Sequence, residues 1–355
     1  MIISSGISLN TDRRARSMLL FIILAVLLFV FIVLDLMTGA VKIPAIKVLS
    51  VLFGTADNYP VWNTILFDFR VPKTLTAILA GSALSVSGLQ MQTIFRNPLA
   101  GPDVLGVSAG ASLGVALVVL GFGDFFVLHN LSYLGNWTQI ISAWVGAGLV
   151  LLLIMFVSLR VRDIMTILIL GILFGSAASA FVSILQYFSQ QSVLKAFVIW
   201  SMGSLGNLTI IQLRVLAISL AAGFLLTLMT LKVLNALLLG ETYSRSMGVN
   251  IKRSRLLIFL STCILSGSIT AFCGPVAFVG IAVPHLARLI FGTANHNVLV
   301  PVSLMLGSIL MLLADIISQI PGSGMLLPVN SVTALLGIPV VIWVIVYNRR
   351  LVSIS

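Results

Sequence analysis

Apolar runs long enough to cross a bilayer follow one another along almost the whole chain. A transmembrane helix needs roughly 20 mainly apolar residues, and these runs are continuous rather than alternating, which excludes a membrane β-barrel. We expect ten spans, near residues 18–38, 63–92, 105–122, 139–158, 164–189, 209–231, 254–272, 277–291, 300–319 and 331–347. The second is long and the eighth is short, so either could be tilted or partly re-entrant. The chain is therefore predicted to be an all-α polytopic membrane protein.

Charged residues are too few to cover a water-facing surface. They make up 8% of the 355 residues, and hydrophobic residues make up 59%, whereas a soluble domain carries about 25% charged residues. Residues 1–355 are therefore expected to form a single transmembrane domain. The sequence has no P-loop and no H-E-x-x-H motif, and three histidines in all. We expect no catalytic residue, no metal site and no cofactor.

The positive charge of the chain follows the pattern of a membrane protein. A net charge of +11 would suggest nucleic-acid binding in a soluble protein, but membrane proteins concentrate Lys and Arg in cytoplasmic loops. With a cytoplasmic N-terminus, fourteen Lys and Arg residues fall inside and six outside. This distribution predicts an even number of spans with both termini in the cytoplasm, and no nucleic-acid partner. The length of the first run, and Asp35 near its end, favour a retained helix over a signal peptide.

The stretch from Arg70 to Gly114, RVPKTLTAILAGSALSVSGLQMQTIFRNPLAGPDVLGVSAGASLG, describes a hairpin of two membrane helices. Gly81 and Gly88 lie on its first helix, and Gly106, Gly110 and Gly114 recur every fourth residue on its second. Small residues at helical spacing let helix backbones approach closely inside a membrane, where no hydrophobic effect drives association. The hairpin is therefore expected to be tightly packed.

The fifth span combines glycines with small polar residues. Gly171 and Gly175 are four apart, and Ser176 and Ser179 follow within a run of alanines. Close helix packing explains the glycines. The serines and alanines also suggest a helix that lines a pathway for a bulky solute, and the two interpretations do not exclude each other.

Three charges near span ends need an explanation, because a charge at the bilayer centre costs about 2.5–3.5 kcal/mol on insertion scales. Asp315 is the deepest acid, and we interpret it as an interfacial or helix-to-helix carboxylate. No second intramembrane carboxylate or histidine is expected to pair with it, which argues against proton-driven transport. Arg70 and Lys73 lie three apart on one helical face at the outer end of the second span. They could extend to lipid headgroups or bind an acidic surface of an external protein.

Residues 232–253, KVLNALLLGETYSRSMGVNIKR, form the longest inside connection. A Gly-Glu start and a later Gly248 predict a short helix that ends at a glycine. Glu241 and Arg245 are four apart and are expected to pair on its surface.

Four blocks in order along the chain resemble the permeases of the iron-siderophore, haem and vitamin B12 family of ABC importers, the FecCD type or type II importers. They are the Arg70–Gly114 stretch, GETYSRSMGVN, GPVAFVGIAVPHLARLIFG and LPVNSVTALLGIPVVIWV. The resemblance covers roughly residues 18–350. It implies ten spans per subunit in the type II importer fold, in agreement with the hydropathy.

The resemblance also implies partners. They are cytoplasmic ABC ATPase subunits, an extracytoplasmic substrate-binding protein and a second permease subunit, expected here as a second copy of this chain, all around a protein embedded in membrane lipid. The expected location is the bacterial cytoplasmic (inner) membrane.

Site residues carried over from the resemblance fall in three groups. Coupling to the ATPase is implied for Gly240, Glu241, Arg245 and Gly248, and docking of the binding protein for Arg70 and Lys73. Thr166, Gly171, Gly175, Ser176 and Ser179 are implied to line the translocation pathway.

Two departures from the family pattern limit this carry-over. Some relatives have a further basic docking residue after the Ala-Asp pair of the ninth span, where this chain has Gln319. Relatives can also carry small hydroxyl residues at the inner gate, where this chain has Ile164 and Met165 before Thr166.

The expected function is ATP-driven import of a metal chelate by alternating access, with no chemistry performed by the permease. Ferric siderophores are the first expectation for the substrate, and haem and cobalamin are the alternatives. An ion-coupled secondary transporter is the competing hypothesis, which would require paired ionisable residues or facing broken helices.

Overall fold

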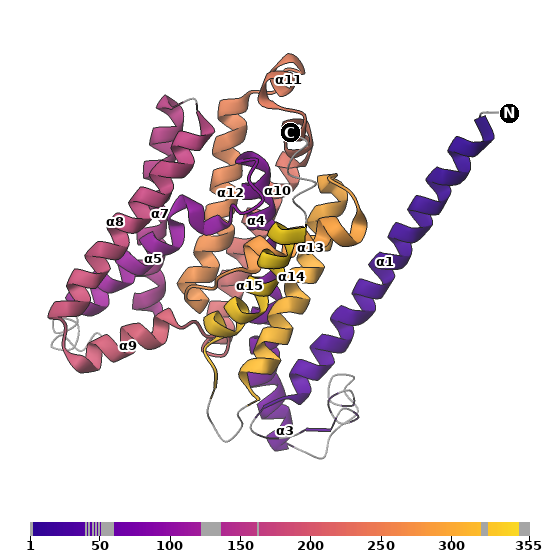
Figure 1. Ribbon diagram of the computed structural model, residues 1–355. Helices are drawn as coiled ribbons and strands as arrows, with labels where there is room; N and C mark the ends of the chain where they lie inside the picture. The colour runs from indigo at the N-terminus through magenta and orange to yellow at the C-terminus, as the bar shows by residue number, and fades with distance from the viewer. Residues whose placement is uncertain are drawn as a thin grey trace.

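The computed structural model describes residues 3–39, 41, 43, 44, 46, 48, 50, 60–121, 136–161, 163–320 and 326–347. Helices account for most of these residues (Figure 1). They are α1 (Ile3–Met37), α3 (Pro60–Thr64), the π-helical η1 (Ile65–Arg70), α4 (Val71–Ile94), the 3₁₀ turn η2 (Pro102–Leu105), α5 (Val107–Ala116), the π-helical η3 (Leu117–Gly121), α7 (Asn136–Arg160), α8 (Ile164–Phe188), α9 (Gln191–Ser201), α10 (Ile210–Leu238), α11 (Glu241–Ser246), α12 (Ile251–Cys273), α13 (Val279–Phe291), α14 (His296–Ser318) and α15 (Val329–Tyr347).

The described helices confirm the predicted membrane architecture. Seven are long and apolar enough to span a bilayer, and three shorter apolar helices complete the set. The second span is the longest at 34 residues, because α3, η1 and α4 run on without a break from Val61 to Ile94. The eighth is short, since α13 has only 13 residues. Both departures in length were expected from the apolar runs.

Two helices, α4 and α12, form the centre of the bundle. Of the most apolar window of each span, 83% is buried in the second span and 78% in α12, against 6% in α1. Helix α4 packs against α10, α12, α13 and α14. Its sequence is rich in Ala, Ser and Gly, which allows several neighbours to approach its backbone. Helix α1 lies on the outside of the bundle. Its C-terminal end lies close to the other helices and its N-terminal end stands away from them (Figure 1).

The glycines of the predicted hairpin lie at the closest helix contacts. A Cβ atom on Gly81 would lie 2.0 Å from the carbonyl oxygen of Gly307, and one on Gly88 would lie 1.8 Å from that of Gly280. A Cβ on Gly114 would lie 2.1 Å from the carbonyl oxygen of Ser142. No side chain fits at these distances, so the tight packing expected from the sequence is confirmed.

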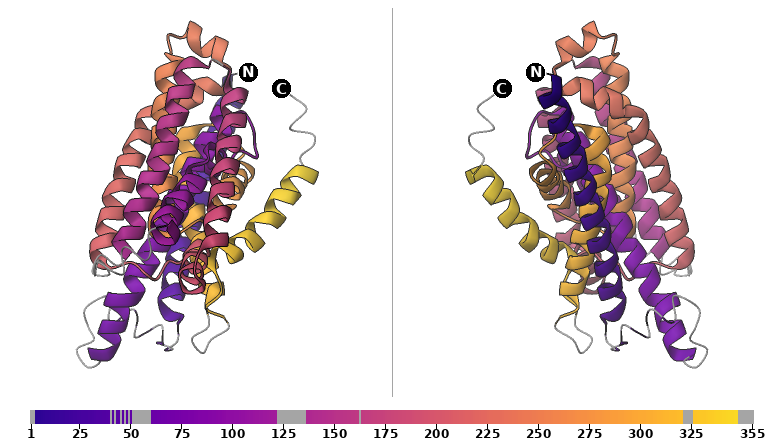
Figure 2. Two further views of the ribbon diagram at one scale, coloured as in Figure 1. Left: turned by 90° about the vertical axis from the view of Figure 1, so that its left-hand side faces the viewer. Right: turned by 90° about the vertical axis from the view of Figure 1, so that its right-hand side faces the viewer.

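The two ends of the bundle carry different elements. Helix α11 and the first residues of α1 lie at one end, and α3 and α9 lie at the other (Figure 1). The last residues of α15 also point toward the end that holds α11 (Figure 2). We call these the α11 end and the α9 end. The described start of α1 thus lies at the α11 end, and α15 points toward it.

Candidate functional site

Four charged side chains gather at the α9 end, and we call Asp35, Arg70, Lys73 and Asp315 the α9-end cluster. They come from α1, η1, α4 and α14. Lys73 Nζ lies 2.7 Å from Asp315 Oδ2. Lys73 is 22% exposed and Asp315 is 2% exposed. The cluster therefore places one partly accessible ammonium group over a buried carboxylate.

Arg70 is buried rather than extended into solution. Its guanidinium donates to the carbonyl oxygen of Leu36 at 2.6 Å, and also to that of Val41. A Cβ on Gly39 would lie 2.9 Å from Arg70 Nη2, so glycine at this position leaves room for the guanidinium. Arg70 thus holds the segment after α1 against the start of α4.

Asp315 has a carboxylate neighbour, which corrects the expectation that no second intramembrane acid would pair with it. The carboxyl group of Asp35 lies beside that of Asp315, and Asp35 Oδ2 accepts a 2.6 Å hydrogen bond from Thr74. Asp35 Oδ1 is buried and has no hydrogen-bond partner. The prediction was wrong because positions far apart in sequence give no sign of which helices become neighbours.

Gln319, where some relatives have a basic residue, also binds Asp315. Its Nε2 donates to Asp315 Oδ2 at 2.9 Å and to the Asp315 carbonyl oxygen at 3.2 Å. The amide therefore satisfies the same carboxylate oxygen that Lys73 pairs with.

A short helix bounded by glycines projects at the α11 end. Helix α11 follows Gly240, whose φ is +112°, and precedes Gly248, whose φ is +83°. Such values favour glycine, which has no Cβ, so the predicted glycine-terminated helix is confirmed. Arg96 donates to the carbonyl oxygen of Leu237 at 3.1 Å, which ties the end of α4 to the end of α10 just before α11.

Three charged residues connect α11 to α12, and we call Glu241, Arg245 and Arg255 the α11-end cluster. Arg255 donates to Glu241 Oε1, and Arg245 Nη2 lies 3.8 Å from Glu241 Oε2. The predicted pair of Glu241 and Arg245 is thus present. Glu241 is 29% exposed, and Arg255, on α12, is 5% exposed. The sequence analysis did not predict this role of Arg255, because it lies 14 residues from Glu241 and no local spacing indicates the pair.

Asp163, the residue directly before α8, caps the N-terminus of that helix. Asp163 Oδ2 accepts from the Thr166 hydroxyl at 2.7 Å and from the Thr166 N–H at 2.8 Å, and Oδ1 accepts from the Met165 N–H at 3.3 Å. These hydrogen bonds, with a smaller contribution from the positive charge of Arg255, lower the pKa of Asp163 below its usual value. Thr166, a predicted pathway residue, therefore lies exposed in the first turn of α8 at the α11 end.

The predicted pathway residues on α8 fall on two faces. A Cβ on Gly171 would lie 2.3 Å from the carbonyl oxygen of Val104, and Gly175 lies against Gly106. Those glycines serve packing against η2 and the start of α5. Ser176 and Ser179 are exposed, on a surface shared with large apolar side chains such as Leu173 and Phe181. Of these four residues, the two serines lie on an open face of the subunit.

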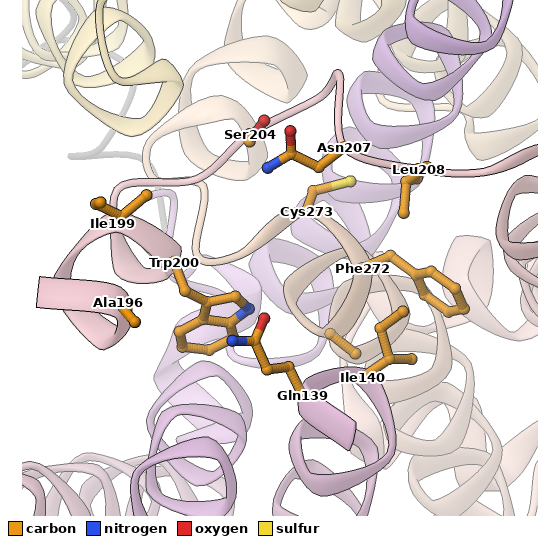
Figure 3. Close-up of a pocket in the computed structure, with 11 residues that line it drawn as sticks. Gln139, Ile140, Ala196, Ile199, Trp200, Ser204, Asn207, Leu208, Phe272 and Cys273 are labelled. Carbon is orange, nitrogen blue, oxygen red and sulfur yellow. The ribbon is translucent and has the colours of Figure 1, made fainter. Parts of the chain in front are cut away.

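A cavity of about 290 Å³ at the α9 end is lined by residues of α7, α9 and α12 and of the segment that follows α9. It is lined mainly by apolar groups, and Figure 3 shows the Gln139 amide beside the Trp200 indole, with Ser204 and Asn207 across from them. Pockets for drug-sized ligands occupy about 300–1,000 Å³. The cavity is thus just below the lower limit of that range.

The described part of the chain holds no cluster of three or more His, Cys, Asp or Glu side chains that could bind a metal ion. Cys263 and Cys273 are buried free thiols. His285 lies in the middle of α13 with Nε2 2.7 Å from the carbonyl oxygen of Pro98.

Comparisons with known proteins agree with this architecture. The model of the FecCD transport family matches residues 27–347. The hemin transport system permease protein HmuU of Yersinia pestis is 34% identical over 331 residues, which cover 93% of this chain and 96% of that protein. The vitamin B12 import system permease protein BtuC of Salmonella paratyphi A is 34% identical over 286 residues, which cover 80% and 84%.

A solved structure has the same fold. It is an inward-facing conformation of a metal-chelate type ABC transporter, with a TM-score of 0.78 and 29% sequence identity. The match covers 92% of this chain and 97% of that one.

Proposed function

The chain belongs to the FecCD transport family, and from this premise we propose that it imports a metal chelate by ATP-driven alternating access, with a ferric siderophore as the first substrate and haem or cobalamin as the alternatives. It is the permease of a metal-chelate type importer. The observation that carries the ATP-driven mechanism is α11. This short helix stands at one end of the bundle and is bonded through Glu241 to the central helix α12.

Helix α11 is proposed as the element that the ATPase moves. Glycines at positions 240 and 248 allow sharp turns on both sides of α11. The helix is therefore short and is held close to the ends of α10 and α12, between which it lies in the chain. The Glu241–Arg255 pair and the Arg96 bond to the end of α10 connect it to α12 and α4. A displacement of α11 would therefore reach the two central helices. On this proposal the α11 end, with both chain termini, faces the cytoplasm.

The opposite end is proposed to receive the substrate-binding protein, with Lys73 as the accessible charge. Lys73 is 22% exposed, whereas Arg70 is buried and its guanidinium binds carbonyl oxygens of the 36–41 segment. Lys73 therefore meets acidic residues of the partner directly, and Arg70 supports the surface around it. Charge pairs of this kind mainly speed and orient encounter.

The pathway is proposed to run along the open face of α8, between two copies of this chain. Ser176 and Ser179 supply small polar groups there, and Thr166 lies at its cytoplasmic end. Gly171 and Gly175 contribute by holding α8 against η2. Few polar groups are available to coordinate a ligand, so selectivity is assigned to the binding protein.

The test is uptake by proteoliposomes that contain this chain and its co-expressed ATPase. Radiolabelled ferric siderophore, haem and cobalamin are offered in parallel, each with its binding protein. Accumulation of one ligand that requires ATP and is lost without the binding protein supports the proposal and identifies the substrate. Uptake that follows an ion gradient without ATP would overturn it in favour of a secondary transporter.

A further inference from the structure

The cation proposed for docking already has an internal partner. Lys73 Nζ contacts Asp315 Oδ2 at 2.7 Å, and the lysine side chain reaches solvent while the carboxylate is 2% exposed. An external carboxylate can therefore approach Lys73 only in competition with Asp315.

Asp315 keeps a donor when Lys73 leaves. The Gln319 amide donates to the same oxygen at 2.9 Å, so the carboxylate is not stripped of all hydrogen bonds. A buried charge that loses every partner is costly, and one that keeps a good donor is less so. The internal pair is thus built so that its exposed member can be exchanged.

The exchange also changes the balance of charge between α1 and α14. Asp35 lies beside Asp315, and its Oδ1 has no hydrogen-bond partner. Arg70, the second cation near Asp35, is held on carbonyl oxygens of the 36–41 segment. When Lys73 turns outward, the neighbouring carboxyl groups of Asp35 and Asp315 lose the positive charge that contacts Asp315.

We propose that a carboxylate of the binding protein displaces Asp315 from Lys73, and that this exchange opens the ion pair that joins α4 to α14 at the α9 end. This rests on the docking role proposed above. We call the pair of Lys73 and Asp315 the latch, because it is closed in the free subunit and opens when the binding protein docks.

The experiment measures binding of the purified cognate binding protein, first identified by the uptake assay, to the permease–ATPase complex in nanodiscs. Asp315→Asn removes the internal competitor, so the dissociation constant should fall by about threefold or more. Lys73→Gln should raise it, and the double variant should match Lys73→Gln alone, because Asp315 acts only through Lys73. A purely structural role for Asp315 predicts weaker or unchanged binding, so the sign of the effect separates the two roles.

Asp68→Asn is the matched control. Asp68 lies on η1 and is exposed, so its substitution makes the same change in net charge at the same end without releasing Lys73. It should leave the dissociation constant within about twofold of wild type, since exposed charges are screened by salt. If Asp68→Asn and Asp315→Asn tighten binding equally, the change in net charge explains the effect and the latch is overturned.

A second measurement does not depend on the binding protein. Acetylation of Lys73 by an N-hydroxysuccinimide ester, followed by mass spectrometry, should be faster in Asp315→Asn than in wild type, with exposed Lys195 as the internal reference. If Lys73→Gln leaves binding unchanged, the docking role itself is wrong. If Lys73→Gln weakens binding while Asp315→Asn neither tightens binding nor speeds acetylation, docking stands and the latch is overturned.

Discussion

The two charged clusters each pair a partly exposed group with a buried group of opposite charge, but the signs are reversed. At the α9 end the accessible member of the pair is a cation, Lys73, and its buried partner is Asp315. At the α11 end the more accessible member of the pair is an anion, Glu241, and its buried partner is Arg255. A second cation, Arg245, also contacts Glu241 there and is the most exposed of the three at 61%. The α11-end cluster therefore holds its anion between two cations, whereas the α9-end pair leaves its cation accessible.

The clusters also differ in what supports the buried member. Asp315 has Gln319 as a second donor, and a second acid, Asp35, lies beside it. Arg255 lies on a central helix and binds Glu241, which in turn contacts Arg245. The first arrangement allows its exposed partner to leave, and the second holds its exposed partner between two cations. We infer that the α9 end is built for exchange and the α11 end for firm transmission.

The largest effect is expected where the two regions are joined, at Gly88 on α4. Gly88→Ala would place a Cβ atom 1.8 Å from the carbonyl oxygen of Gly280, which both backbones must move to avoid. The variant should fail to assemble as a monodisperse complex in size-exclusion chromatography. Gly148→Ala is the control, because no atom lies within 4 Å of a Cβ there, and it should assemble as the wild type does. Normal assembly of Gly88→Ala would contradict the close contact.

Next in size is loss of Glu241 at the α11 end. Glu241→Ala removes the carboxylate that Arg255 binds, and breaking a buried pair costs about 3–5 kcal/mol when the remaining charge is fully buried. Since Glu241 is 29% exposed, the cost should be smaller and should appear mainly in coupling. ATP-dependent uptake should fall by about tenfold or more, with Glu241→Asp retaining part of it. Uptake near the wild-type level in Glu241→Ala would remove this pair from the coupling route.

Loss of the exposed member at the α9 end should cost less. Lys73→Met leaves Asp315 with Gln319 as donor, so we expect the unfolding temperature to fall by about 2–4 °C. Cys263 and Cys273 are buried and free, and a thiol-reactive fluorescent maleimide reports their exposure during heating. Lys195→Met, at an exposed position on α9, should leave the temperature unchanged. A larger fall for Lys73→Met than for Glu241→Ala would reverse the contrast between the two ends.

The smallest effect is expected at the N-cap of α8. The Thr166 hydroxyl and N–H lower the pKa of Asp163, so its stabilising contribution is present above the usual Asp value of about 3.9 and is lost as the pH falls through the lower folded value. Asp163→Ala should lower the unfolding temperature slightly at neutral pH and flatten its decline below about pH 4. The same maleimide measurement at several pH values checks this. An unchanged acid profile would show that the cap contributes nothing.

The sequence was sufficient for the spans, for the glycine contacts and for α11, because each depends on local pattern. Hydropathy locates a span, and Gly240 and Gly248 mark the ends of a short helix from within the 232–253 segment. Contacts between distant helices were not accessible in this way. Asp35 beside Asp315 and Arg255 bound to Glu241 depend on which helices become neighbours, and no residue spacing carries that information. The serines and glycines of α8 were also grouped together, although they lie on different faces.

The unbroken course of the second span has a mechanical consequence. Helix α4 begins one residue after Arg70, carries Lys73 in its first turn and ends two residues before Arg96. Its 24 residues extend over about 36 Å at 1.5 Å per residue. A continuous helix of this length moves as one rigid element, so a small tilt at one membrane surface produces a matching displacement at the other. The motions of the two ends of the protein are then coupled by the geometry of α4, because the helix has no flexible break between them.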